Sequence, residues 1–479
     1  MSQIKSVHAG HRGRMRERFL SSGTQSMLPH QLLEMLLFYA IPYKDTNPLA
    51  HSLLDTLGSL KSVIEADRDV LVSHKGIGAH TADFLSDLSS YALTAFAATD
   101  RTQDTAVKIE AILPKLKALH GNGREDAVSL VMIGNNQRLI SIEKIESVSI
   151  HSAAFDPNVL VKRALDAHAS KVIVAHSHKD SYLPYPEDDS VTLLLRDRFS
   201  LIGTVMLEHY LVAPHGCVPL SHRILSSQIW HHYMEKDRVS LFADAVTDAK
   251  RLLLRRDPLC GDANGKDVQV HRLSRLLSYA VKGDTVEAAS RLLEKEGELL
   301  SLAYLPMPCF EEANLSKNAA TLVKLAPLAY ASALYDEQKR GLAFRASSIA
   351  SLFVYRAIGL INENAFIALF DEDGRLIDLL SVGEGSVNAT GISLRLLTEQ
   401  AHFRRARYAC LAHNHPFGVP TPSPNDLDTT KSVIDALAIA DCTLLEHFIT
   451  AGTSYATVIR GNRIFDSYSK GPAEFYDFD

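Results

Sequence analysis

Apolar residues recur at three- to four-residue spacing from about Leu28 to Phe96, with prolines and glycines between the groups. This spacing predicts a bundle of short amphipathic helices. From Asp126 onward, short apolar runs alternate with helical segments, which predicts an α/β unit with a mixed sheet. The expected elements are a strand pair around residues 135–136, a helix at 157–169, a strand at 171–175, a helix at 189–201 and a strand at 204–212.

The same pattern occurs twice along the chain. VIVAHSH, which ends at His178, matches CLAHNH, which ends at His415, and the segment 207–210 matches 445–448. The helical parts repeat as well, because 45–58 and 284–297 share their spacing, and self-similarity of this kind indicates a tandem duplication. The predicted parts are a helical domain at 1–105, an α/β domain at 106–228, a charged helical linker at 229–266, a second helical domain at 267–345 and a second α/β domain at 346–479.

Composition narrows the class of protein. The chain has 479 residues, 46% hydrophobic and 22% charged, and no apolar run of membrane length. Its start lacks the apolar core of a secretory signal, and its five cysteines are scattered, so we expect a cytoplasmic protein with reduced thiols and no membrane partner. A net charge of -6 gives no overall attraction to nucleic acid, so any DNA contact would be local.

Candidate metal ligands, His413 and His415, directly follow an apolar run at residues 408–412. In a strand, residues i and i+2 point to the same face, so both imidazoles could bind one metal ion. Ser423 and Asp426 come after a turn rich in Pro and Gly. Two nitrogen ligands, a carboxylate and a fourth position for water form a catalytic zinc site. A lone HxH pair is more often an ordinary strand or loop pair, but the complete string is far more demanding.

The string HNHPFGVPTPSPND resembles the JAMM motif of the JAB/MPN metallohydrolases and, within them, the motif of the RadC-like proteins. The resemblance implies two α/β (α+β) JAB/MPN-like domains, each preceded by a helix-hairpin-helix-like domain. It implies Zn2+ held by His413, His415 and Asp426, with Ser423 supporting the developing oxyanion. It also implies a glutamate from an earlier strand that takes a proton from the attacking water.

The two copies depart from this pattern in opposite directions. The first has Glu143 at the place expected for the base, then His176, His178 and, at the matching distance, Asp189 as ligands. Its serine position aligns with a proline. In the second copy the aligned base position is Leu380, and Glu384 four residues on is a substitute only if the strand geometry differs. Late in each copy, Glu-His pairs at 208–209 and 446–447 fit either a role in orienting a ligand histidine or that of ordinary strand residues.

The helical region holds a turn, Gly76-Ile77-Gly78, that resembles the turn of a helix-hairpin-helix. Gly76 and Gly78 would let backbone N–H groups approach a phosphate at a helix N-terminus. The alternative is a tight turn between helices with no ligand. Likewise, the arginine-rich segment 11–18 fits a phosphate-binding arm or the solvated end of a helix. In the second copy the glycine turn is replaced by a segment around 314–318.

These patterns support three hypotheses. The first is a zinc-dependent JAMM-type hydrolase of amide or isopeptide bonds in a protein or peptide substrate. The second is a zinc-binding pseudoenzyme that serves as a scaffold, because each copy has lost a different catalytic residue. The third is a DNA-binding accessory protein of RadC-type DNA repair, with contact through the N-terminal helical domain.

Overall fold

The computed structural model describes residues within 10–476, with gaps, and leaves out 477–479. The gaps are 99–108, 122, 124, 135–138, 147–148, 153–154, 180–182, 203, 215, 221–240, 243, 257–264, 297, 385–392, 417–419, 421, 423, 461–464, 466–467 and 469–471. Contacts divide the chain into two compact units. Residues 1–100, 241–416 and 429–479 form the first, and residues 101–240 with the short segment 417–428 form the second.

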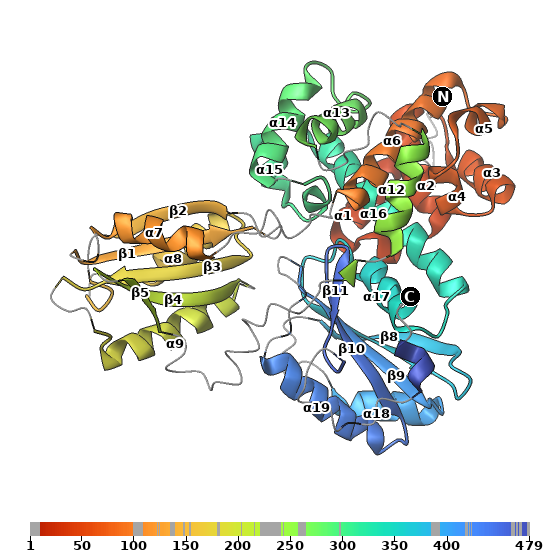
Figure 1. Cartoon of the computed structure of the whole chain (residues 1–479). Coiled ribbons are helices and arrows are strands. Elements are labelled where there is room, and N and C mark those ends of the chain that lie inside the picture. The colour runs from red at the N-terminus through yellow and green to blue at the C-terminus, as the bar shows by residue number, and fades with distance from the viewer. Residues whose placement is uncertain are drawn as a thin grey trace, which may run out of the picture. The chain divides into compact units, whose positions relative to one another are not determined.

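The second unit contains a five-stranded mixed sheet of order β2-β1-β3-β4-β5 with helices on both faces (Figure 1). Strand β1 is antiparallel to β2 and β3, whereas β3 and β4 are parallel. One face packs on α8 and α9, and the other packs on α7. The elements are α7 (Ile109–Leu119), β1 (Ala127–Ile133), β2 (Leu139–Glu146), α8 (Asn158–Asp166), β3 (Lys171–Ser177), α9 (Pro186–Ser200), β4 (Val205–Ala213) and β5 (Gly216–Pro219).

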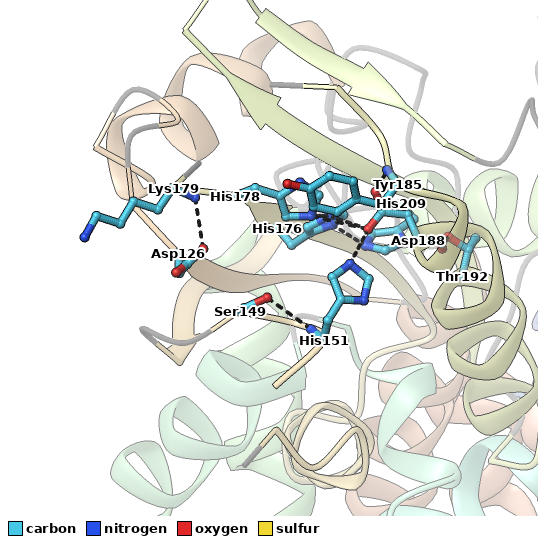
Figure 2. A network of polar contacts seen from close by, with 10 residues as sticks. All are labelled: Asp126, Ser149, His151, His176, His178, Lys179, Tyr185, Asp188, Thr192 and His209. Carbon is cyan, nitrogen blue, oxygen red and sulfur yellow. Dashed lines mark hydrogen bonds and ion pairs between the residues drawn. The ribbon is translucent and has the colours of Figure 1, made fainter. Parts of the chain in front are cut away.

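Strand β3 shows why this sheet forms where it does. Its sequence KVIVAHS is buried at every position after the first, as expected for a central strand covered on both faces. The apolar run stops at His176, so polar side chains begin at the carboxyl end of the strand. Helix α9 begins soon afterward, at Pro186, and brings its first turn back to the same end (Figure 2).

In the first unit, helices from both halves of the chain share one hydrophobic core. The Tyr39 hydroxyl donates to the Asn318 carbonyl at 2.9 Å, and the Tyr330 hydroxyl donates to Glu65 at 2.7 Å. The helices are α1 (His11–Ser22), α2 (Pro29–Ala40), α3 (Asn47–Leu57), α4 (Leu60–Ile64), α5 (Arg68–Ser73), α6 (Ala79–Ala97), α12 (Asp244–Arg256), α13 (Lys266–Leu277), α14 (Thr285–Glu296), α15 (Met307–Glu312), α16 (Lys317–Arg340) and α17 (Ala346–Ala357), with 3-10 turns at Thr24–Ser26, Leu300–Ala303 and Ala473–Tyr476.

Helix α12 lies inside the segment 229–266 that the sequence predicts as a linker. Its Ala249 and Leu253 are buried in the shared core, and Arg256 donates to Ser89 of α6 at 2.7 Å. This part of the chain is therefore packed against the first helical segment. The five-part division into domains remains a prediction.

The first unit also contains the second sheet, of order β6-β11-β10-β9-β7-β8. Strand β7 is antiparallel to β8 and β9, and β9 is parallel to β10, which repeats the β2-β1-β3-β4 arrangement. The predicted mixed α/β architecture in two copies is confirmed. The elements are β6 (Leu241–Phe242), β7 (Asn364–Phe370), β8 (Leu376–Glu384), α18 (Leu394–Phe403), β9 (Tyr408–Asn414), α19 (Pro424–Ala438), β10 (Thr443–Ala451) and β11 (Ser454–Thr457).

The glycine turn of the helical region lies between α5 and α6. Gly76 has a φ of 99°, in the left-handed region, and Gly78 precedes the first residue of α6. Between α15 and α16, Asn314 adopts a φ of 60° and takes the same place. Ile77 and Leu315 follow these residues and are both buried. The two turns are thus equivalent in shape, with asparagine supplying the left-handed residue in the second copy.

Candidate metal centres

The first candidate centre lies at the carboxyl end of β3 in the second unit. His151, His176, His178 and Asp188 offer ligand atoms that all lie within 4.8 Å of one another, and Figure 2 shows these side chains converging. His176 Nε2 is 2.9 Å from His178 Nε2 and 3.0 Å from Asp188 Oδ1, which is 3.4 Å from His178 Nε2. Ligand atoms about 2.1 Å from a tetrahedral zinc ion are roughly 3.4 Å apart, so the group fits such an ion with small adjustments.

The structure brings Asp188, and not the expected Asp189, to the two histidines. Asp188 is the third residue of α9, as Asp426 is of α19. The loop from the second histidine to the helix has seven residues in the first copy (179–185) and eight in the second (416–423). Counting residues from the histidine therefore selects a position one too far along the helix.

A chain of hydrogen bonds fixes the protonation of His176. The Thr192 hydroxyl donates to the Asp188 backbone carbonyl at 2.6 Å, so it accepts from His209 Nδ1 at 2.7 Å. Burial lowers the pKa of both His176 and His209, so both rings are neutral at pH 7. His209 Nε2 is then an acceptor, and His176 Nδ1 donates to it at 2.8 Å. His176 Nε2 consequently carries its lone pair toward the centre, as a metal ligand requires.

The charge at this centre is negative before any ion arrives. Burial by itself raises the pKa of Asp188, but the neighbouring imidazoles of His176 and His178 and the hydrogen bond from the Tyr185 backbone N–H outweigh it and hold this pKa far below its usual range. The ionised Oδ1 faces the bare Nε2 of His176 at 3.0 Å. Two acceptors this close repel unless a cation or a proton lies between them, so the donor set suits a divalent cation.

The second candidate centre comprises His413, His415 and Asp426, as the sequence predicts. His413 Nε2 is 3.0 Å from His415 Nε2, and His413 Nδ1 is 2.8 Å from His447 Nε2. His447 Nδ1 in turn lies 2.7 Å from the hydroxyl of Thr430, which is four residues after Asp426. Thr192 is four residues after Asp188, so the same histidine-histidine-threonine network supports both centres.

Strand register tests the alignment of the two base positions. Glu143 pairs with Leu130, which pairs with Val174, two residues before His176. Leu380 pairs with Ile367, which pairs with Leu411, two residues before His413. Leu380 thus occupies the place of Glu143.

Paired residues share a face of a sheet, so Glu143 is on the face of His176, with Cα atoms about 12 Å apart by strand spacing and rise. Glu143 accepts a hydrogen bond from the Ser141 hydroxyl at 3.0 Å and is not in the converging group. The alternative acid, Glu384, pairs with Asn364, outside the row of His413.

In each copy, the position of the motif serine is the residue directly before the helix that carries the candidate aspartate, α9 or α19. Ser423 itself lies outside the described residues. By position relative to the helix start, its counterpart in the first copy is Tyr185 and not Pro186. The Tyr185 ring stacks on His178 with ring centroids 4.4 Å apart, and its backbone N–H donates to Asp188 Oδ2 at 2.7 Å (Figure 2). An aromatic ring therefore covers one side of the first centre.

Two kinds of candidate site residue give little signal in the sequence. His209 and His447 sit in Glu-His pairs that fit ordinary strand residues equally well, yet each contacts a ligand histidine. His151 carries no spacing signal, because it is a single histidine in the loop after β2. Only the fold brings it to the first centre.

The comparison with family models agrees with this geometry. The model described as RadC-like JAB domain matches residues 106–225 and again residues 345–463. The chain belongs to the RadC-like family. The two matched segments confirm the predicted pair of RadC-like units in tandem, and each contains one candidate metal centre.

Three curated relatives each align with less than half of this chain. The UPF0758 protein FN0909 of Fusobacterium nucleatum is 26% identical over 213 residues, which are 42% of this chain and 91% of the relative. The UPF0758 protein BTH_I0781 of Burkholderia thailandensis is 30% identical over 212 residues, 44% of this chain and 81% of the relative. The UPF0758 protein SPO0054 of Ruegeria pomeroyi is 27% identical over 203 residues, 42% and 91% respectively. A chain with two RadC-like units accounts for these proportions.

The sequence also predicts no membrane partner, and the length and polarity of the helices bear on this expectation. In the part of the chain that the structure describes, no helix has the length and apolar character needed to span a membrane.

Proposed function

We propose that this RadC-like chain is a zinc-dependent hydrolase of amide or isopeptide bonds in a protein or peptide, and that the reaction occurs at the second centre. The observation that carries the proposal is the group of His413, His415 and Asp426. Three protein ligands leave one position of a tetrahedral ion for water or substrate, which is the arrangement of catalytic zinc sites. The first centre offers four side chains instead of three.

Each residue of the second centre has a separate proposed role. His413, His415 and Asp426 would hold the ion, which, when bound, acts as a Lewis acid and makes water acidic enough to attack at neutral pH. His447 and Thr430 orient His413 through hydrogen bonds of 2.8 and 2.7 Å. His413 is 1% exposed and Asp426 is 3% exposed, so bulk water competes little for either. Ser423 remains our proposal for the oxyanion donor.

A base is the missing part. Leu380 stands where the first copy has Glu143. This position of the sheet therefore has no carboxylate that could accept the proton of the attacking water. General-base help contributes roughly 100- to 10,000-fold. We therefore expect slow hydrolysis at the second centre. In the first copy, Glu143 is the residue proposed as the base if the reaction takes place at that centre instead.

The test is metal-dependent cleavage of fluorogenic amide and isopeptide peptides by the zinc-loaded chain. We expect slow turnover that is lost in H413A and D426N and retained in H176A and E143Q. Turnover that survives H413A and disappears in E143Q would move the reaction to the first centre. Chelation and zinc re-addition serve as the control for metal dependence.

A zinc-binding scaffold is the second candidate, favoured by the leucine at position 380. A scaffold binds zinc without turnover, so metal content together with the cleavage assay separates the two. Two bound zinc ions and no cleavage of any tested peptide would support the scaffold. Cleavage abolished by H413A would exclude it.

DNA binding of the RadC repair type is the third candidate, and the left-handed Gly76 before α6 is the feature that favours it. Lys75 beside it is exposed. The arginine-rich segment gives less support, because Arg12 donates to the Ile41 carbonyl at 2.7 Å and lies over the Phe38 ring. Fluorescence anisotropy with duplex DNA tests this: binding should weaken steeply with salt and in K75E, and absent or salt-independent binding would contradict it.

A further inference from the structure

His151 lies in the loop that follows β2 and contacts the first centre through Asp188. Its backbone N–H donates to the Ser149 hydroxyl at 3.3 Å, and its side chain is 23% exposed. Its ring centroid is 5.5 Å from that of His178, and its Nε2 lies 2.7 Å from Asp188 Oδ1 (Figure 2). The loop thus directs an imidazole nitrogen at the same oxygen as the two strand histidines.

The two oxygens of Asp188 have different partners. Oδ2 accepts the Tyr185 backbone N–H at 2.7 Å. Oδ1 faces three Nε2 atoms, those of His151, His176 and His178, at 2.7, 3.0 and 3.4 Å. A histidine that only orients a ligand carboxylate can use the oxygen that faces away from the ion. Convergence of three imidazoles on the inward oxygen is instead the pattern of a complete coordination shell.

We propose that His151 is a fourth protein ligand, so that the first centre is a closed site of three histidines and one aspartate. This inference rests on the proposed binding of zinc by the chain. Four protein ligands are typical of structural zinc sites, whereas catalytic sites keep one position for water. The first copy then holds its ion as a structural element, and hydrolysis is left to the second copy.

The second copy provides the contrast. The sequence between β8 and α18, residues 385–393, reads GSVNATGIS and contains no His, Cys, Asp or Glu. Among the described residues, only three side chains form its candidate group. The first copy also covers its centre with the Tyr185 ring, where the second has Ser423. Both differences add protein groups around the first centre that have no counterpart in the sequence of the second.

The experiment uses the full chain with the second centre removed by H413A/H415A, loaded with zinc. X-ray absorption at the zinc edge counts imidazole ligands, and chelator competition gives the dissociation constant. We expect three imidazoles, and two in the additional variant H151A, with affinity lowered on the order of 100-fold. H168N is the matched control, because asparagine tolerates the left-handed φ of 49° at that position, and it should change neither value.

The outcomes separate this inference from the proposed function. Bound zinc with only two imidazoles while His151 is present would overturn the closed site and leave zinc binding intact. An unchanged imidazole count and affinity in H151A would do the same. Absence of zinc from the first centre would overturn both the inference and the proposed metal binding there.

Discussion

At the scale of single residues, the first centre depends on which of two adjacent carboxylates faces the histidines. Asp188 Oδ1 is 3.0 Å from His176 Nε2, whereas Asp189 is outside the converging group. We expect D188N to weaken zinc binding at the first centre by more than about 100-fold, because the amide loses the charge of a ligand. Chelator competition in the H413A/H415A background measures this.

D189N is the neighbouring control, since it removes a carboxylate one position away. It should leave the zinc affinity of the first centre within about threefold of the parent chain. An equal loss of affinity in both variants would contradict the assignment of Asp188.

Thr192 fixes the direction of the hydrogen-bond chain that prepares His176. T192V keeps the side-chain shape and removes the hydroxyl that accepts from His209 and donates to the Asp188 carbonyl. We expect zinc affinity to fall roughly 10-fold, within the usual range for residues that orient a metal ligand. T192S restores the hydroxyl and should restore affinity; a full loss in T192S would point to packing instead.

The sequence reaches some of these residues and misses others for physical reasons. His176, His178, His413 and His415 follow from strand periodicity, because i and i+2 share a face. Spacing selects Asp189 in place of Asp188, because the loop before α9 is one residue shorter than its counterpart. A deletion of this kind cannot be detected from spacing alone. His151 and the two network histidines have no periodic signal, since only the folded chain brings them to the centres.

At the scale of elements, strand register decides what the second centre lacks. Leu380 of β8 lies in the row where β2 carries Glu143, and it is partly exposed. L380E should therefore supply the missing carboxylate and raise the rate of cleavage by about 100-fold or more. The steady-state rate with the fluorogenic peptides measures it.

L380Q is the matched control, because glutamine has a similar shape and no ionisable group. A gain in L380E that L380Q does not share supports a base at this row. Equal rates in L380E, L380Q and the parent chain would show that the row does not reach the reacting water.

The composition of helix α12 leads to the prediction of a linker, because most of its residues are charged or exposed. Only a narrow stripe, including Ala249 and Leu253, is buried in the shared core. L253A should lower the free energy of unfolding by about 2–4 kcal/mol, since Leu253 is 5% exposed. Urea titration followed by helical circular dichroism measures the change.

The adjacent L254A is its control, because Leu254 is 52% exposed. Its effect should stay within about 0.5 kcal/mol. Similar losses in the two variants would contradict the placement of Leu253 on the buried face of α12, because alanine favours a helix at least as well as leucine does.

At the scale of the whole molecule, duplication predicts two independent metal centres. Each converging group is built from its own strand and helix, so the chain should bind two zinc ions. H176A and H413A should each remove one ion and leave the other, as measured by elemental analysis after dialysis. Loss of both ions in either single variant would show that the centres are coupled.

The tandem architecture is readable from the sequence because repeated strings survive in both copies. The packing of the helical segments is not, because apolar periodicity shows that a helix has a buried face without showing what covers it. Residues 15–97 and 249–358 each supply buried side chains to one cluster, and Tyr39, Tyr91 and Tyr330 make hydrogen bonds across the two halves.

That shared core has a consequence for the history of the chain. After a gene duplicates end to end, the two copies can part again by a break between them, provided that each still folds alone. Here a break would leave each fragment with one side of a common apolar interior facing water. The fusion has therefore become difficult to reverse, because each copy covers apolar surface that the other would expose.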